Sequence, residues 1–438
     1  MIVNSPTKRR MFLITLLHSI PTTFFMYGTP FYTTLRYGWG ASQNLLAQAL
    51  IGFGVAIGAL AGGQIAHATR PQRAIAIGLI GCLLAALLGL VSTQVGGPPL
   101  LLTALFLLSV SQAVGWPGIE SGLMENEPHA VVQNYVSYFN LTWSFGTATA
   151  FLIATPLMRW LGLPVLFVLP AIFYAANLLL LSTYHAPAAA AYQSSENDSA
   201  EGDFARDDYT GNVLAKNALD SRSTPVLSPS TDRDAAAAVN AHVTADAARV
   251  RGDAYRWLGW LANPLAFIAI NVIVSYNPTI QARLHFSLAM ASIWCGLWFY
   301  VRMIAFELLR RWTWWHYKWG FLCGAFAVTM VSFAALVGAP NLAVLLIAQI
   351  VFGLCVGLIY QSSLFYSMAD SDAQGAHGGF HESFIGVGIL VGPLIAYSGT
   401  LLAPKNAALP VGMALGGMGL GLAVLIALGL RTRSSAIN

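Results

Sequence analysis

The sequence predicts an all-α polytopic membrane protein with twelve transmembrane helices arranged as two related six-helix bundles. Of its 438 residues, 56% are hydrophobic and only 9% are charged, whereas soluble globular domains carry roughly 25% charged residues. Apolar segments recur along the chain at about 20 residues each, the length that a helix needs to cross a bilayer core of roughly 30 Å. No basic patch is interleaved with aromatic residues, so the composition gives no case for nucleic-acid binding.

The first half of the chain contains six predicted spans. Lys8, Arg9 and Arg10 precede the first span as in a secretory signal, but no small-residue cleavage site follows, so we expect a retained helix. Pro30 is expected to bend this helix near its outer end, because proline lacks the N–H for a helical hydrogen bond. The six spans are at residues 11–33, 44–66, 74–94, 98–122, 131–157 and 163–183.

Residues 185–256 differ in composition from the rest of the chain. They are rich in Ala, Ser, Asp and Asn and hold eleven of the 18 acidic residues. Such a segment cannot bury enough apolar surface to offset its ordering entropy. We predict a mostly disordered cytoplasmic linker whose last part, 234–257, forms a short surface helix running into the seventh span. A tether is favoured over a dedicated binding role.

The second half repeats the organisation of the first. In the fourth and tenth spans Glu120 falls opposite Gln361, and in the fifth and eleventh spans Asn140 falls opposite Glu382. Such matches support a duplicated unit, with bundles at 1–184 and 257–438 related about an axis normal to the membrane. The six spans of this half are at residues 258–281, 286–309, 319–338, 341–367, 377–402 and 408–430.

The distribution of basic residues predicts the orientation. With the N-terminus inside, seventeen of the 22 Lys and Arg residues fall on cytoplasmic segments and only Arg36, Arg159, Arg283 and Lys405 fall outside. Cytoplasmic loops of membrane proteins carry an excess of positive charge. We therefore expect an inner-membrane protein with both termini in the cytoplasm.

The loop between the second and third spans carries part of a known motif. Residues 63–73 read GQIAHATRPQR, which resembles the G-x-L-A-D-R-x-G-R-R signature of the major facilitator superfamily. The matching glycine and basic end place the family's cytoplasmic gating role on Gly63, Arg70 and Arg73, while His67 and Ala68 replace the acid and the first arginine. Six spans, a long loop and six more spans resemble this family over the whole chain. The resemblance implies alternating-access transport, and we expect a monomer.

Four ionisable or amide residues interrupt the apolar spans at comparable depth in the cytoplasmic half: Arg302, Glu382, Glu120 and Gln361. An ionisable group at membrane depth is costly and is a functional candidate by default. Arg302 is predicted either to contact a carboxylate or other anion through its forked guanidinium or to close an inner gate by pairing with Glu382. Glu382, next to His381, is a candidate protonation site, because burial favours the neutral carboxyl group; a packing ion pair is the alternative.

Other polar residues have weaker predictions. Glu120 is expected to have an exposed structural role, and Glu307 to form a surface charge cluster with Arg310 and Arg311. For each residue of the candidate cavity lining taken singly, hydrogen bonding between helices is the alternative to substrate contact. These lining candidates are Tyr27, Tyr32, Asn140, Thr142, Trp143, Asn271, Tyr276, Asn277 and Gln281.

The leading functional prediction is a secondary active transporter that moves a small polar or anionic solute, with proton-coupled symport. Efflux of amphipathic drugs is the second prediction, supported by the many aromatics but weakened because residues 146–150 lack the Gly-Pro pattern of the family's drug antiporters in the fifth span. A membrane-embedded enzyme acting on lipid-linked substrates is a distant third, suggested by His377, His381, Glu382, Asp370 and Asp372. No cofactor and no metal site are expected, because the chain has neither a phosphate-binding loop nor H-E-x-x-H spacing.

Overall fold

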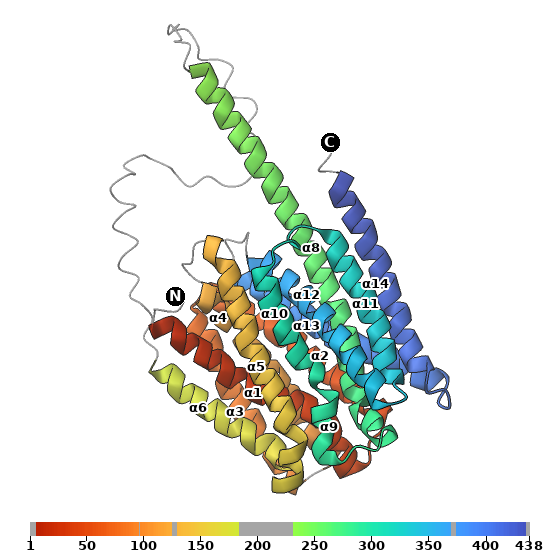
Figure 1. Cartoon of the computed structure of the whole chain (residues 1–438). Helices are drawn as coiled ribbons and strands as arrows, with labels where there is room; N and C mark the ends of the chain where they lie inside the picture. The colour runs from red at the N-terminus through yellow and green to blue at the C-terminus, as the bar shows by residue number, and fades with distance from the viewer. Residues whose placement is uncertain (1–5, 96, 125–128, 184–230, 369–373, 435–438) are drawn as a thin grey trace. The chain divides into compact units, whose positions relative to one another are not determined.

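The computed structural model describes residues 6–95, 97–124, 129–183, 231–368 and 374–434 (Figure 1). These residues form helices and their connections, without a strand among them. Twelve of the helical segments are long and apolar enough to cross a membrane. The number and order of the spans predicted from the apolar periodicity are therefore confirmed.

The six helices of the first half are each at least as long as a bilayer core requires. Two of the short turns between them are followed directly by proline at the start of a helix, Pro71 and Pro98, where its missing N–H costs nothing. The helices are α1 (Pro6–Tyr37), α2 (Ala41–Ala68), α3 (Pro71–Gln94), α4 (Pro98–Met124), α5 (His129–Leu161) and α6 (Val165–Ser182).

The second half begins with the long helix α8. Its membrane-length part is Gly252–Arg283, and it starts at Thr231, within the stretch that the sequence predicts as a linker. Residues 185–230 of that stretch lie outside the described residues. The helices of this half are α8 (Thr231–Arg283), α9 (Leu288–Cys295), α10 (Leu297–Arg311), α11 (Trp319–Gly338), α12 (Leu342–Met368), α13 (Gln374–Leu402) and α14 (Leu409–Ser434).

The eighth predicted span is broken. It consists of α9 and α10, which are separated at Gly296. A Cβ atom at this position would lie 2.4 Å from Cδ1 of Phe151 on α5, so only glycine allows α5 to approach this closely. The break thus lies at a contact between the two halves.

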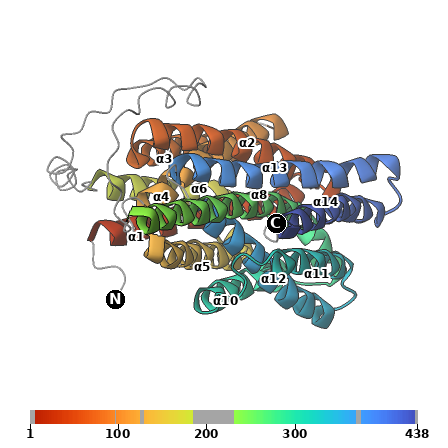
Figure 2. The same cartoon turned by 90° about the horizontal axis from the view of Figure 1, so that it is seen from above.

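Of the described residues, those up to 183 and those from 251 onward belong to one compact unit, and 231–250 belong to another. Within the first unit the two halves meet along α2 and α13, which run side by side (Figure 2). A Cβ atom at Gly52 of α2 would lie 2.3 Å from the Leu390 backbone nitrogen, and one at Gly386 of α13 would lie 2.3 Å from that of Ala56. Small residues let the two backbones touch, as is common between membrane helices.

The first turns of α1 mark one end of the bundle. Lys8 Nζ donates to the Leu123 carbonyl at the end of α4 (2.6 Å), and Arg10 Nη1 donates to the Thr183 carbonyl after α6 (2.5 Å). Cationic side chains favour such helix C-termini, where carbonyl groups lack helical partners. The end of the bundle at which α1 begins and α4 and α6 end is called the N-terminal end below; the other is the opposite end.

The predicted charge cluster at the end of α10 is confirmed. Glu307 accepts hydrogen bonds from Arg310 (2.7 Å) and Arg311 (2.7 Å) at i,i+3 and i,i+4 spacing. The Glu307 and Arg310 side chains are about a quarter to a third exposed and Arg311 is more so, so the cluster lies at the surface.

Candidate functional site

A cavity of about 80 Å³ lies between the two halves, roughly midway along the helices that line it. Both halves contribute walls, and the lining combines aromatic rings with hydroxyl, amide and charged groups. Of the site residues predicted from sequence, Arg302, Glu382 and Trp143 line it, together with Tyr27. The lining residues are Thr22, Thr23, Met26, Tyr27, Val55, Gln112, Trp116, Phe139, Trp143, Thr147, Phe267, Arg302, Tyr360, Glu382, Ile385 and Ile389.

Arg302 is the buried cation of the cavity, with 1% of its surface exposed. Its guanidinium carbon lies 4.4 Å from the ring centroid of Trp143, 5.0 Å from that of Trp298 and 5.2 Å from that of Phe299. Trp298 and Phe299 precede Arg302 by four and three residues, so they share its face of α10. Cation–π attraction to these rings holds the guanidinium in place.

The predicted ion pair between Arg302 and Glu382 is not formed. Within the described ranges Arg302 has no ion-pair partner, and its Nε and Nη2 atoms have no hydrogen-bond acceptor. The aromatic rings hold the guanidinium, while Glu382 is engaged elsewhere. A buried charge without a counter-ion is costly, and here it faces a cavity into which an oxyanion could bring acceptors.

Glu382 has neighbours on its own helix and on α12. Its Oε1 atom accepts a hydrogen bond from the Tyr360 hydroxyl at 3.3 Å and lies 3.9 Å from Nε2 of His381. The other ring nitrogen of His381, Nδ1, lies 3.1 Å from Oγ of Ser363. His381 itself is buried and is not part of the cavity lining.

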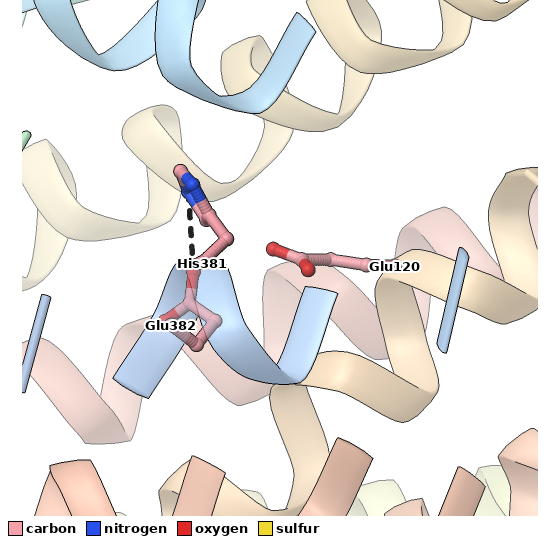
Figure 3. Close-up of side chains that lie close together, drawn as sticks. All are labelled: Glu120, His381 and Glu382. Atoms are coloured by element: carbon pink, nitrogen blue, oxygen red, sulfur yellow. Dashed lines mark ion pairs between the residues drawn. The ribbon is translucent and has the colours of Figure 1, made fainter. Parts of the chain in front are cut away.

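The expectation that Glu120 is exposed is wrong. Its surface is fully buried, because the first turn of α13 packs over it: a Cβ atom at Gly378 would lie 2.8 Å from its Oε2 atom. The side-chain ligand atoms of Glu120, His381 and Glu382 all lie within 4.8 Å of one another, and Figure 3 shows the Glu120 carboxyl group pointing toward the other two. Neither Glu120 oxygen has a hydrogen-bond partner among the described residues.

Asn140 and Gln361 bind each other rather than lining the cavity. Asn140 Nδ2 donates to Gln361 Oε1 at 2.7 Å, and Gln361 Nε2 donates to Ser137 Oγ at 3.0 Å. Trp143 Nε1 donates to Asn140 Oδ1 at 2.9 Å. These amides therefore make the hydrogen bonds between helices that the sequence offered as the alternative role, and they join α5 of one half to α12 of the other.

The remaining predicted residues lie away from the cavity. Tyr276 and Asn277 of α8 are buried but do not line it. Gly63 of α2 packs against Gly379 of α13, where an added Cβ atom would lie 2.7 Å from the Gly63 Cα atom. Arg70, between α2 and α3, and Arg73, in the first turn of α3, are exposed.

Several lining residues were missed in the sequence. Tyr360, Gln112 and Thr147 are polar residues within membrane-length helices, and that was the available signal. Two neighbours hold Gln112 in place. Its side-chain oxygen accepts a hydrogen bond from Trp116 Nε1 at 2.9 Å, and its backbone carbonyl oxygen lies 3.1 Å from His18 Nε2. His18 is fully buried.

The halves touch on both sides of the cavity. On the N-terminal side lie the Asn140–Gln361 bond and the Glu120–Glu382 contact. On the opposite side Thr155 Oγ1 and Ser292 Oγ are 2.7 Å apart, and the Phe299 ring packs on those of Tyr27 and Phe151. The cavity is therefore bounded along the helix direction by two layers of contact between α1–α6 and α8–α14.

Two pseudo-equivalent six-helix halves around a central cavity are the architecture of a membrane transporter. The family model described as the Major Facilitator Superfamily matches residues 11–393. The chain belongs to this superfamily, as the loop motif and the topology had indicated. It is thus a multi-pass membrane protein of a transporter family.

Solved structures agree with the assignment. The chain is similar to the crystal structure titled as a major facilitator superfamily transporter, FucP, in the outward conformation, with a TM-score of 0.60 and 15% sequence identity over 97% of this chain and 98% of that one. At this identity the likeness bears on the fold alone. A search of curated proteins finds no match to the chain.

Proposed function

We propose that the protein is a secondary active transporter that carries a small anionic solute across the cytoplasmic membrane by alternating access. The observation that carries this proposal is Arg302, a buried cation in the cavity between the halves. Its Nε and Nη2 atoms have no acceptor in the part of the chain that the structure describes. A guanidinium presents its N–H groups as a fork that matches a carboxylate or phosphate. Transporters of this architecture bind their substrates near the midplane, between the repeats.

The rest of the wall suits a solute that is small and partly apolar. Thr22, Thr23 and Thr147 supply hydroxyl groups, while Trp116 and Phe267 supply ring faces. A few convergent polar groups on a largely apolar wall are typical of small-molecule sites. A short carboxylate that carries hydroxyl groups fits this combination better than a neutral or cationic solute does.

We further propose that transport is coupled to protons through Glu382, as symport. Glu382 lines the same cavity as Arg302 without pairing with it, so its protonation state alters the charge that the solute meets. The same proposal includes the membrane orientation, in which the N-terminal end of the bundle faces the cytoplasm. It also includes a monomeric protein and a role for the segment 185–256 as a cytoplasmic tether between the halves.

A screen on purified protein identifies the solute. Ligands that bind only the folded state raise its apparent melting temperature, so we expect small carboxylates to stabilise the wild-type protein and matched neutral amides to do so much less. Uptake of the best ligand into proteoliposomes should then increase with an inward proton gradient. Unchanged uptake in both Glu382→Gln and Arg302→Ala would refute the proposed roles of these two residues.

Efflux of amphipathic compounds is the second candidate. The aromatic share of the lining, including Trp116, Trp143 and Phe139, favours it. Stabilisation by hydrophobic cations in the same screen, together with drug sensitivity of a deletion strain, would favour this function over anion transport.

A further inference from the structure

Two contacts between the halves are related by the internal repeat but differ in chemistry. In the internal repeat Glu120 of α4 corresponds to Gln361 of α12, and Asn140 of α5 corresponds to Glu382 of α13. The Asn140–Gln361 pair and the Glu382–Glu120 pair therefore occupy equivalent places on the two sides of the interface between the halves. One place holds two amides, and the other holds two carboxyl groups.

The amide pair is complete without any additional ligand. An amide both donates and accepts, and Asn140 Nδ2 lies 2.7 Å from Gln361 Oε1. Two ionised carboxylates, in contrast, have acceptors only and repel each other at this depth. With one proton, one carboxyl group becomes a donor and the pair reproduces the donor–acceptor match of the amide pair.

The surroundings supply no other cation for the carboxyl pair. Among the residues that the structure describes, Tyr360 and His381 are the titratable side chains that face it, and of these two the Tyr360 hydroxyl donates to it. Arg302, across the cavity, forms no ion pair in the described part of the chain. On α1, Lys8 donates to the Leu123 carbonyl at the end of α4.

We propose that Glu120 and Glu382 form a cation site between the two halves, that its occupant is a single proton held by the pair, and that loss of this proton opens the N-terminal end of the bundle. This rests on the proposed function, for which it specifies where the coupling proton binds. Deprotonation leaves two negative charges across the α4–α13 contact. The amide pair across the α5–α12 contact does not titrate, so only one of the two equivalent contacts is released.

The position of the pair explains why opening occurs at the N-terminal end. Glu120 lies under Gly378, and Gly63 lies against the next residue of α13, Gly379. Both contacts are on the N-terminal side of the cavity. Separating α4 from α13 there gives Glu382 and the cavity access to that side, while the contact between Thr155 and Ser292 keeps the opposite side closed.

A divalent metal ion is the competing occupant, since carboxylate and imidazole groups are its ligands. The packing favours the proton. Glu120 and His381 do not line the cavity, Gly378 packs directly on Glu120, and Nε2 of His381 remains 3.9 Å from Glu382. An ion with ligands at about 2.0–2.2 Å would require these groups to move together.

The test measures the opening of the N-terminal end as a function of pH, without any solute. Spin labels are attached at His67→Cys in the last turn of α2 and at Trp312→Cys directly after α10, both exposed, in protein whose four native cysteines are replaced. Pulsed dipolar distances are recorded in lipid nanodiscs between pH 5 and pH 9. We expect a short distance at low pH and a growing population at longer distance as pH rises.

Matched variants assign the effect to the pair. Glu120→Gln, which keeps a donor–acceptor match without a titrating pair, should keep the short distance across the whole range. The double variant Asn140→Asp, Gln361→Glu transfers the carboxyl pair to the amide position and should enlarge the population at longer distance at high pH. Glu307→Gln, which removes a surface carboxylate, should behave as the wild type.

Three results would overturn the proposal. The first is a wild-type distance that does not change with pH, and the second is a Glu120→Gln protein that opens like the wild type. The third is closure of the wild type by Zn²⁺ or Mn²⁺ at neutral pH that Glu120→Gln abolishes; this result would assign the site to a metal. If the double variant fails to fold, the single variant still decides. Carboxylate binding and uptake are measured separately, so a pH-insensitive protein that still transports would refute the proton site alone.

Discussion

Replacing Arg302 by methionine should make the protein more stable and unable to bind its solute. The guanidinium has 1% of its surface exposed and no ion-pair partner among the described residues. Burying a charge costs several kcal/mol after relaxation, and the cation–π contacts to Trp143 and Trp298 offset about 2 kcal/mol of this. Methionine has a similar length and no charge, so we expect a net stabilisation of about 2 kcal/mol.

The assay is thermal unfolding of purified protein in detergent, followed by intrinsic tryptophan fluorescence. For a chain of this length 1 kcal/mol corresponds to roughly 1–2 °C in melting temperature, so Arg302→Met should melt about 2–4 °C above the wild type. Arg302→Lys is the matched control. It keeps the charge but loses the flat surface that stacks on the rings, so it should melt at or below the wild-type temperature.

The two variants should therefore differ in the sign of the shift. If Arg302→Met melts several degrees below the wild type, as Arg302→Lys does, the guanidinium has a stabilising partner, and the inference that it awaits an anion fails. In the presence of the carboxylate ligand the order should reverse, because only the wild-type protein gains stability from binding. A charge-assisted hydrogen bond contributes about 1.5–3 kcal/mol, which corresponds to roughly 10–150-fold in affinity.

Three further changes have distinct expected outcomes. Asn140→Leu removes the donor to the buried Gln361 Oε1 atom and should cost about 1–3 kcal/mol, seen as a lower melting temperature. No change would mean that the amide pair does not hold the halves together. Gly386→Leu introduces a side chain where even a Cβ atom would lie 2.3 Å from the Ala56 nitrogen, so uptake and stability should both fall. Glu307→Gln removes a surface contact of at most about 1 kcal/mol and should leave uptake unchanged. Normal uptake by Gly386→Leu, or loss of uptake by Glu307→Gln, would contradict the packing described for α2–α13 and the surface position of Glu307.

The fold could be predicted because each span carries its own signal. A run of about 20 apolar residues has few alternatives to a transmembrane helix, and the repeat between the halves predicted that Glu120 corresponds to Gln361 and Asn140 to Glu382. The break at Gly296 had no such signal. A single glycine in an apolar run is tolerated in a helix, and the break is understood only once Phe151 is seen against it.

The position of the site residues along their helices could be predicted, but the direction in which their side chains point could not. Counting residues at 1.5 Å per residue gives the height of Arg302 and Glu382 along their helices, and both do line the cavity. Which way each side chain points depends on how the helices are rotated and packed, which sequence alone does not specify. For this reason the ion pair remained an alternative for Arg302, whose guanidinium the structure stacks on aromatic rings, and Glu120 was expected at the surface although α13 covers it.

The most direct test of transport around this cavity is the accessibility of one lining residue from each side of the membrane. Thr147→Cys, in a protein without its native cysteines, places a thiol in the lining of the cavity. We expect a membrane-impermeant thiol reagent to modify this cysteine both in right-side-out vesicles and in inside-out vesicles. The two modification rates should change in opposite directions with pH, and both should fall when the carboxylate ligand is bound. Modification from one side only under every condition, or rates that ligand and pH leave unchanged, would contradict alternating access through this cavity.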